Sequence, residues 1–402
     1  MWSRYQDDIV ASLPLPSASA SLPQPLLAIS KHKLKNLYLY FEQKRSMSSS
    51  TVCSSHKFTN TAIRIVNCHA EGECGDVIVS GITDIPGETL WEKSRYIAKD
   101  KCLRNYVLQE PRGGVFRHVN LLVKPINPEA EIGFIIMEPE DTPPMSGSNS
   151  ICVATVALET GIIPITATDM NFKMEAPGGL VDVAAKCTDG KATQICVTNV
   201  PSFVGDIGVK LEVQGIGTLN VDTAYGGDLF VIVNSEDLGL DIIPENAKEL
   251  VEVGMKITRA ANEQLNFLHP TNPDFASHFS FCMIAKPIFY NDDGVAISHT
   301  AVAIQPGKID RCPTGTGCSA RMALLHAKGQ LKKGDKMIGR SIIGSEFHCC
   351  LEEEMELGRI AAIRPSIAGQ AWITGTTEHR LHRTDPYPFG YRLTDTWPKK
   401  LW

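Results

Sequence analysis

The segment PPMSGSNSICVATVALETG, residues 143–161, places a Ser-Gly-Ser-Asn-Ser run directly before a stretch that is almost free of charge and ends at a glycine. A helix that is apolar nearly all round must be buried, because no face of it suits water. We therefore predict a buried central helix from Ser146 to Gly161, with Gly161 in a left-handed C-terminal cap. Ser146 could be a helix cap and nothing more, or it could also carry chemistry.

A second segment, TGTGCSARMALLHAKG at residues 314–329, repeats this arrangement. Again a hydroxyl residue precedes glycines and small polar residues, a mainly apolar helix follows, and a glycine stands at the far end. Short apolar runs divided by Gly, Pro, Asn and Asp surround both segments and are typical of strands. The two copies predict two similar strand-rich domains, each built around its own central helix. Amphipathic patterns at residues 88–109 and 245–265 predict two further helices on the surface.

Composition restricts the class of protein. The 402 residues are 43% hydrophobic and 21% charged, which is typical of globular proteins, and the net charge of −6 without a long basic run argues against nucleic acid as a partner. No apolar stretch reaches the length of a transmembrane helix, so no membrane partner is expected. The twelve cysteines are scattered, which favours reduced thiols and a cytoplasmic location over a disulfide framework. A zinc site at Cys68, His69 and Cys74 would lack a second ligand pair, and Cys349 and Cys350 suit a core or a strand.

Residues 1–57 differ from the rest of the chain. LPLPSASASLPQPLL, residues 13–27, is rich in Pro and Ser and predicts a flexible N-terminal extension. Acidic residues and prolines argue against a signal peptide, and a mitochondrial presequence is a minor alternative. Met47 is a candidate alternative start, so the presence of residues 1–46 in the working protein stays open.

The beginnings of the two central helices are where chemistry is expected. First-turn amides have no acceptor inside a helix and carry the positive end of its dipole, and glycine lets a ligand approach them closely. Two such starts that face each other could grip a carboxylate and present one hydroxyl to each face of the neighbouring carbon. For either copy alone, simple capping is the commoner explanation. The pairing of two copies favours a functional site.

Several segments resemble the proline racemase family, which includes hydroxyproline epimerases and trans-3-hydroxy-L-proline dehydratases. They are DTPPMSGSNSICVATVALETG (141–161), DTAYGGDLFVIV (222–233), KIDRCPTGTGCSARMALLHAKGQL (308–331), SIIGSEF (341–347) and DPYPFGYRLTDTW (385–397). The resemblance covers residues 60–400 in order. It implies an α/β (α+β) fold like that of diaminopimelate epimerase: two similar domains, each a curled, mostly antiparallel sheet around a central helix.

The resemblance also implies how the chain is divided and what it binds. The first domain is expected at residues 58–200 plus 365–402, because the C-terminal segment returns to it, and the second at 201–364. Catalysis is expected to need no metal and no organic cofactor. The expected ligand is a small proline derivative, and a homodimer is implied. Family members hold the substrate carboxylate at positions that correspond here to Gly147, Asn149, Gly315 and Thr316, and the ring nitrogen at the position of Asp310.

The catalytic positions depart from the racemase pattern. Racemases and epimerases commonly have cysteine in Met-Cys-Gly-His and Pro-Cys-Gly-Thr-Gly, whereas this chain has Ser146 and Thr314 there, with Ser148 in place of the histidine. Racemisation needs a base and an acid that exchange roles, which a thiol with a pKa near 8.5 can do. An aliphatic hydroxyl is far less acidic and needs strong activation. Family dehydratases tend to carry threonine at the second position, usually with cysteine at the first.

Our hypothesis from the sequence is therefore dehydration of trans-3-hydroxy-L-proline. Ser146 would take the α-proton, Thr314 would hydrogen-bond the 3-hydroxyl or a water, and Asp310 would accept from the ring ammonium. The sequence shows no histidine or lysine beside Ser146 that would activate it. Two alternatives stay open: a proline or 4-hydroxyproline racemase or epimerase, and a binding protein with the cleft but no turnover.

A few other side chains remain ambiguous. Asp228, in YGGDLF, could touch the substrate or be a structural turn acid. Cys312 and Cys318 flank Thr314 and could replace the missing thiol, although inert buried cysteine is more common. His69 and His118 are interpreted as structural histidines.

Overall fold

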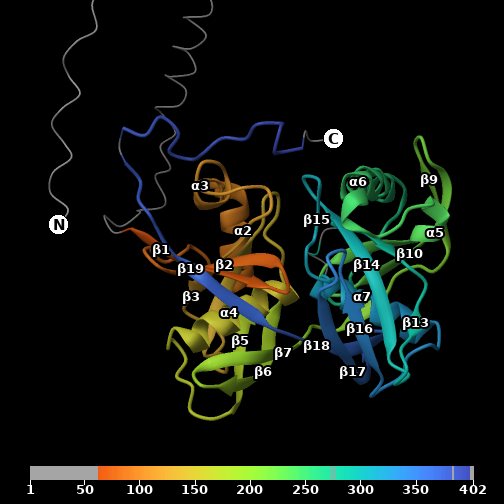
Figure 1. Cartoon of the computed structure of the whole chain (residues 1–402), viewed down its shortest axis with the longest axis horizontal. Helices are drawn as coiled ribbons and strands as arrows, with labels where there is room; N and C mark the ends of the chain where they lie inside the picture. Colours follow the sequence, from red (N-terminus) through yellow and green to blue (C-terminus); the bar gives the residue numbers. More distant parts are fainter. Residues whose placement is uncertain (1–61, 273–274, 276, 383, 399–402) are drawn as a thin grey trace, which may run out of the picture. The chain divides into compact units, whose positions relative to one another are not determined.

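The computed structural model describes residues 62–272, 275, 277–382 and 384–398. The proposed N-terminal extension, residues 1–57, lies outside the described residues, as does Met47. All of the described residues belong to one compact unit. Its described part has a mixed, strand-rich α+β fold with two similar domains, as Figure 1 shows.

The first domain is formed mainly by the N-terminal half of the described chain. Its strands are β1 (Ile63–Ala70), β2 (Glu73–Ser80), β3 (His118–Val123), β4 (Ile132–Met137), β5 (Asp169–Ala176), β6 (Gly179–Thr188), β7 (Lys191–Thr198) and the C-terminal β19 (Ala371–His379). Its helices are α2 (Leu90–Asp100), α3 (Cys102–Leu108) and the central α4 (Gly147–Glu159). Because β19 pairs with β1, the last described strand completes the sheet that contains the first described strand.

The second domain repeats the same plan. Its strands are β8 (Ser202–Val204), β9 (Val209–Val213), β10 (Gly217–Tyr225), β11 (Leu229–Asn234), β12 (Phe281–Ala285), β13 (Phe289–Tyr290), β14 (Ala296–Ile304), β15 (Lys308–Ile309), β16 (Lys336–Arg340), β17 (Glu346–Leu357) and β18 (Ile360–Gly369). Its helical segments are α5 (Ser235–Leu238), η1 (Pro244–Asn246), α6 (Ala247–Gln264) and the central α7 (Gly315–Ala327).

The strand pairing establishes that the two domains are similar. In the first, the order β19-β1-β2-β3-β4-β5-β6-β7 contains two parallel pairs, β2 with β3 and β4 with β5, and antiparallel pairs elsewhere. In the second, the order β8-β10-β11-β12-β14-β16-β17-β18 has its parallel pairs, β11 with β12 and β14 with β16, at the same two places. α4 lies between β4 and β5 in the sequence, and α7 lies between β14 and β16, after the short β15, so each central helix connects the two strands of the second parallel pair. The similarity between the two sequence segments therefore reflects two domains with the same fold.

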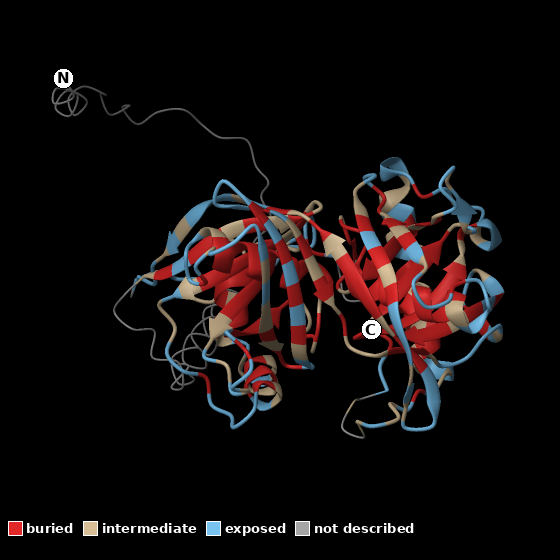
Figure 2. Ribbon diagram, turned by 90° about the horizontal axis from the view of Figure 1, so that it is seen from below, coloured by how far each residue is buried: buried red, intermediate tan, exposed pale blue. Residues whose placement is uncertain are grey.

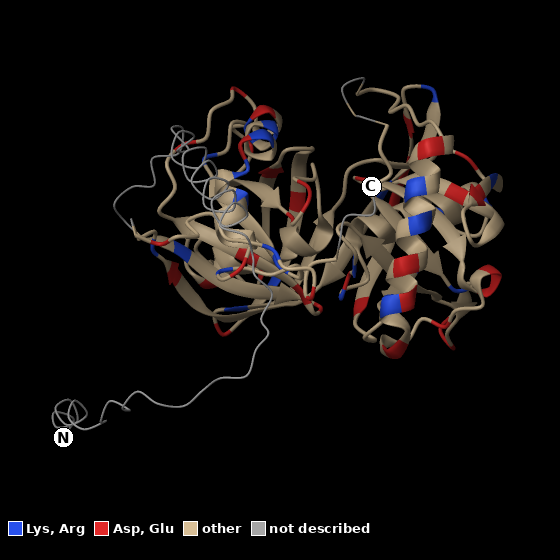
Figure 3. Cartoon of the chain, turned by 90° about the horizontal axis from the view of Figure 1, so that it is seen from above, with Lys and Arg blue, Asp and Glu red and all other residues tan. Residues whose placement is uncertain are grey.

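Both central helices are buried, as the absence of a polar face predicts. Every residue of α4 from Gly147 to Leu158 is buried, and α7 is buried from Gly315 to Ala320. In Figure 2, buried residues alternate with exposed ones along several strands, as they do along β6. By contrast, α6 buries one face, which includes Leu250 and Ile257, and carries charges on the other, which Figure 3 shows.

Local signals in the sequence agree with most element ends but not all. Gly161 and Gly329 have φ angles of 76° and 71°, so the left-handed glycines predicted after both central helices are confirmed. The single helix predicted at residues 88–109 is wrong. It is broken at Lys101, whose φ of 59° ends α2 and precedes α3. A repeat of apolar residues predicts which face of a helix is buried. It does not predict that a single residue such as Lys101 adopts a left-handed conformation and ends the helix.

The strand that joins the domains bears on their proposed division. β18 pairs with β7 of the first domain through Ser366–Gly369 and with β8 of the second through Ala362–Ile363. β18 thus connects the two domains, and the division near residues 200 and 365 stays a prediction. Among the described cysteines, ten are free thiols, but Cys102 is disulfide-bonded, so the expectation of reduced thiols does not hold there.

Candidate active site

The two central helices meet at their N-terminal ends. A Cβ atom built on Gly147 would lie 2.9 Å from the Cα of Gly315, and one built on Gly315 would lie 2.8 Å from the Cα of Gly147. Only glycine permits such an approach of two backbones. The first-turn amides of both helices therefore lie close together, and their partial positive charges add in one small region. This arrangement suits a carboxylate ligand.

Ser146 stands at the N-cap position of α4, but its side chain does not cap the helix. Its backbone is extended, with φ of −153° and ψ of 126°, and its hydroxyl makes no bond to a first-turn amide. Instead, Ser146 Oγ accepts a hydrogen bond of 2.9 Å from Asn149 Nδ2. The capping interpretation is therefore wrong for the side chain. The Ser146 hydroxyl belongs to a side-chain network, which the pattern of helix caps could not indicate.

Thr314 stands at the same position of α7 and has an unusual backbone. Its φ of 60° is in the left-handed region, which a β-branched residue rarely adopts. Its buried hydroxyl donates a hydrogen bond of 2.7 Å to Asp310 Oδ2. Strain of this kind persists only where the surrounding structure holds it, and it is concentrated at functional sites. Thr314 and Asp310 therefore act as one fixed pair.

The YGGD loop packs against the two helix starts. A Cβ built on Gly227 would lie 3.0 Å from Thr316 Cγ2 and 3.3 Å from Met145 Cβ, which places this glycine between α7 and the residue before Ser146. The neighbouring Asp228 is buried. The structure thus brings the segment that contains Asp228 to the place where the helices meet.

Asp228 has an unusual environment for a carboxylate. Burial, followed by the nearby Asp141, raises the pKa of Asp228 to about 7. Two hydrogen bonds of 2.7 Å, from the Leu229 amide and the Ser280 hydroxyl, both reach Oδ1. Asp228 can therefore change its charge near neutral pH, which is typical of groups at functional sites.

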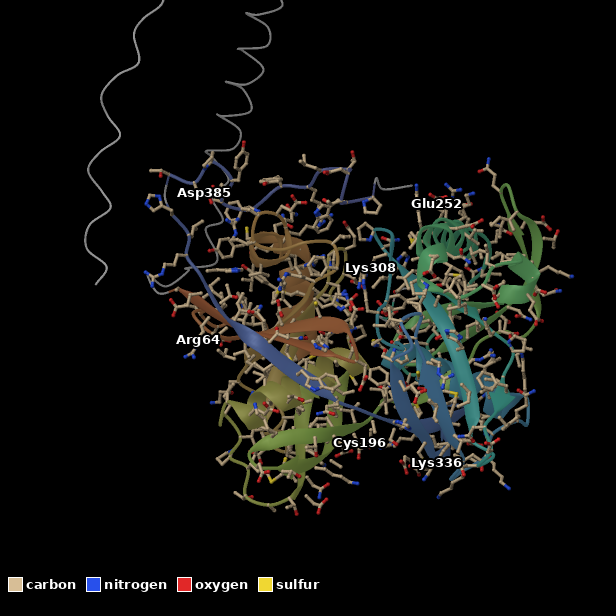
Figure 4. All side chains as sticks on the ribbon, viewed as in Figure 1. Arg64, Cys196, Glu252, Lys308, Lys336 and Asp385 are labelled. Atoms are coloured by element: carbon tan, nitrogen blue, oxygen red, sulfur yellow. The ribbon has the colours of Figure 1, made fainter. Side chains whose placement is uncertain are left out.

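A buried group of charges beside Thr314 was missed in the sequence. Lys308 Nζ lies 2.6 Å from Glu73 Oε1 and 3.4 Å from Asp310 Oδ1. The other oxygen of Glu73 accepts a bond of 2.6 Å from the Arg311 amide. Figure 4 labels Lys308 where β15 faces the first domain. Because Glu73 lies on β2, this ion pair joins the two domains directly beside the candidate site.

His118 completes this group and is neutral. Burial, followed by the charge of Lys308, holds the pKa of His118 well below its usual range. Its ring nitrogens lie 3.6 Å from Glu73 Oε1 and 3.6 Å from Glu138 Oε1, distances too long for hydrogen bonds. Burial, followed by the charge of Asp310, raises the pKa of Glu138 well above its usual range.

Glu73, His118 and Asp310 also have the composition of a metal site, with ligand atoms within 4.8 Å of one another. Lys308 already supplies the positive charge there, because its ammonium lies between the two carboxylates. A metal ion would have to displace a buried lysine. The donor set therefore fits an internal ion pair better than a metal.

The cysteines near Thr314 are held as thiols. The Ser148 hydroxyl hydrogen-bonds Cys312, and burial, followed by the charge of Asp310, raises the pKa of Cys312 well above its usual range. Cys318 donates to the Pro313 carbonyl. Its hydrogen bond with Cys349, followed by burial, raises the pKa of Cys318 well above its usual range. A neutral thiol is a poor base. Neither cysteine replaces the thiol that Thr314 lacks.

The structure places every residue of the sequence-based site at or beside the meeting point of α4 and α7. They are Ser146 at the N-cap of α4, Gly147, Ser148 and Asn149 on α4, Asp310, Thr314, Gly315 and Thr316 at the start of α7, and Asp228 in the YGGD loop. Sequence patterns do not indicate four further residues of this region, Glu73, Asn120, Glu138 and Lys308, and they predict only a structural role for His118. A signal exists for two of them: His118 and Asn120 are polar at alternate positions of the otherwise apolar β3.

Among the described residues, no helix is long and apolar enough to cross a membrane. In the described chain, two similar domains place the glycine-rich starts of their central helices against each other. The model of the family described as proline racemase matches residues 65–392, and the chain therefore belongs to the proline racemase family. Membership supports a racemase, an epimerase or a related activity.

Two solved structures are similar to most of the chain. One is a hydroxyproline epimerase from Agrobacterium vitis with bound trans-4-OH-L-proline, at 35% identity and a TM-score of 0.79, covering 85% of this chain and 97% of that one. The other is a probable proline racemase from Agrobacterium radiobacter K84 with bound carbonate, at 37% identity and a TM-score of 0.78, covering 83% and 98%.

Proposed function

We propose that this chain removes water from trans-3-hydroxy-L-proline to give an enamine that becomes Δ1-pyrroline-2-carboxylate. The observation that carries the proposal is the hydrogen bond from Thr314 to Asp310 at 2.7 Å. The second face of the site thus holds a hydroxyl bound to a carboxylate, and the neighbouring thiols are neutral. Such a site has one group to take the α-proton, Ser146, and a second that positions, which is enough for elimination but not for two-base racemisation.

In the proposed complex, the first-turn amides of Gly147, Asn149 and Gly315 hold the substrate carboxylate, assisted by Ser148 and Thr316. Positive helix ends stabilise the negative charge that builds up on the carboxylate as the α-proton leaves. Asp310 accepts from the ring ammonium, and Asp228 is a second acidic contact to the substrate.

The reaction balances within the substrate. Ser146 Oγ, ionised by loss of its proton to solvent, takes the α-hydrogen as a proton and becomes a neutral hydroxyl. The electrons of that C–H bond form the C2=C3 double bond, and the 3-hydroxyl leaves from C3 as hydroxide, which takes a proton from solvent. Thr314 orients this hydroxyl or a water on the opposite face. The α-hydrogen and the hydroxyl together make the water that is released, and no oxidant or reductant is required.

The experiment is proton NMR in D2O of the purified protein with trans-3-hydroxy-L-proline, trans-4-hydroxy-L-proline and L-proline in separate tubes. We expect only the 3-hydroxy compound to disappear, with formation of pyrroline-2-carboxylate. Ser146→Ala should lower kcat about 10²- to 10⁴-fold, the usual contribution of a positioned base. Substrate should still raise the melting temperature of this variant, because the carboxylate site remains.

The second candidate is a proline or hydroxyproline epimerase, and the similarity to the Agrobacterium vitis enzyme favours it. Deuterium at the α-carbon of the 4-hydroxy compound or of proline, without loss of water, would establish it and refute the dehydratase. Ligand-induced stabilisation without any chemical change would instead indicate a binding protein.

A further inference from the structure

The environment of Ser146 contains a donor that the proposed function leaves unused. Asn149 Nδ2 lies 2.9 Å from Ser146 Oγ and 3.3 Å from His118 Nδ1. Asn149 and His118 are both buried. A serine that takes a proton needs stabilisation of negative charge on its oxygen, and a fixed donor at hydrogen-bond distance supplies it.

The orientation of the Asn149 amide follows from its neighbours. Asn120 Nδ2 lies 3.3 Å from the Asp76 carbonyl oxygen, which can only accept, so this end of Asn120 is the NH2 group. The same NH2 group donates to Asn149 Oδ1 at 2.8 Å. The NH2 group of Asn149 must then face Ser146 Oγ and His118 Nδ1. Both of its protons are directed to acceptors.

His118 is a suitable acceptor for the second proton. An amide NH2 only donates, so His118 Nδ1 must be unprotonated. The groups that face the ring are Glu73 and Glu138. Burial, followed by the charge of Lys308 and assisted by that of Arg311, lowers the pKa of His118, outweighs the opposite effect of Asp310 and keeps the imidazole neutral. A protonated imidazole would repel the amide and turn it away from Ser146.

We propose that Asn149, oriented by Asn120 and the neutral His118, is the positioning residue that holds Ser146 Oγ and stabilises negative charge on it while Ser146 takes the α-proton. The inference rests on the proposed role of Ser146 and holds for dehydration and for epimerisation alike. It assigns the activator that the sequence does not reveal. The proposed role gives the side-chain amide of Asn149 no bond with the substrate. We therefore expect this side chain to affect the chemical step and not the binding of substrate.

The test is the Asn149→Ala variant of the full chain, assayed on whichever of the three proline compounds the wild type converts. Hydrogen bonds to charged groups suggest a fall in kcat of about 10- to 100-fold, with KM little changed. The pH at which kcat reaches half its plateau should move upward, because loss of a donor disfavours the ionised serine. A purely structural role would not move this pH.

The matched control is Asn262→Ala. Asn262 lies on α6, outside the candidate site. Its Nδ2 also makes two hydrogen bonds of 2.9 Å, to the carbonyl oxygens of Thr258 and Phe279. We expect a lower melting temperature for this variant with kcat and its pH profile unchanged. If Asn149→Ala fails to fold, Asn120→Leu frees the Asn149 amide without removing it and should shift both quantities in the same direction by a smaller amount.

The outcomes separate this inference from the proposed function. If Ser146→Ala abolishes turnover while Asn149→Ala and Asn120→Leu keep the wild-type kcat and pH profile, the positioning role is refuted and the role of Ser146 stands. If Ser146→Ala is as active as the wild type, or the wild type converts none of the compounds, both are refuted.

Discussion

At the scale of single residues, a few side chains decide what this site can do. Thr314 is fixed in a strained conformation with its hydroxyl bound to Asp310. Ser146 has the amide of Asn149 as its donor. The two hydroxyl positions are therefore not equivalent, although the sequence segments that contain them are alike. Ser146 Oγ accepts a hydrogen bond, whereas Thr314 Oγ1 donates one.

Asp228 provides a prediction for the dependence of activity on pH. Its pKa is raised to about 7, chiefly by burial, so it is neutral below this pH and charged above it. Only the charged form attracts the substrate ammonium. We therefore expect kcat/KM to rise through about pH 7, and to lose this rise in Asp228→Asn, with low values throughout. An unchanged profile in the variant would show that Asp228 is a structural turn acid.

At the scale of elements, the site depends on how closely two helices approach. The Gly147 and Gly315 backbones are in contact, and the strands around each helix hold it in place. Neither helix alone has two sets of amides directed at one point. The geometry of the carboxylate site is thus a property of the pair.

Gly147→Ala tests this contact. Its Cβ would lie 2.9 Å from the Cα of Gly315, and backbone cannot move as a flexible side chain does. We expect a loss of about 1–3 kcal/mol in the free energy of unfolding, measured in urea, together with most of the activity. Gly375→Ala on β19 is the control, because its Cβ would meet only Asn67 Oδ1, at 4.0 Å. Equal behaviour of the two variants would disprove the importance of the contact.

At the scale of the whole molecule, a buried ion pair joins the domains beside the site. Lys308 Nζ and Glu73 Oε1 are 2.6 Å apart, and both side chains are almost fully buried. Each charge would be costly without the other. The pair therefore favours the arrangement in which the two helix starts face one another.

Lys308→Met should destabilise the protein by about 3–5 kcal/mol, because it leaves Glu73 buried and unpaired. Adding Glu73→Gln should restore part of this loss, which urea unfolding of the two single variants and the double variant would measure. Lys173→Met removes a pair of the same length, 2.6 Å to Glu129, on the surface and should have little effect. Additive losses for Lys308 and Glu73 would show that the pair is not coupled.

The sequence by itself determined the features that depend on neighbouring residues. Runs of small polar residues before apolar segments located both central helices, their glycine ends, and the hydroxyls at Ser146 and Thr314. Family resemblance supplied Asp310 and the epimerase-like fold, because motifs keep their order along the chain.

Only the tertiary structure decided which side chains meet across the fold. His118, Asn120 and Asn149 come from β3 and α4, and Lys308 pairs with a carboxylate from the other domain. Their contacts are set by strand pairing and burial over long separations, which local patterns do not record. For the same reason, the pKa values of Asp228 and His118 follow from their surroundings and not from their place in a motif.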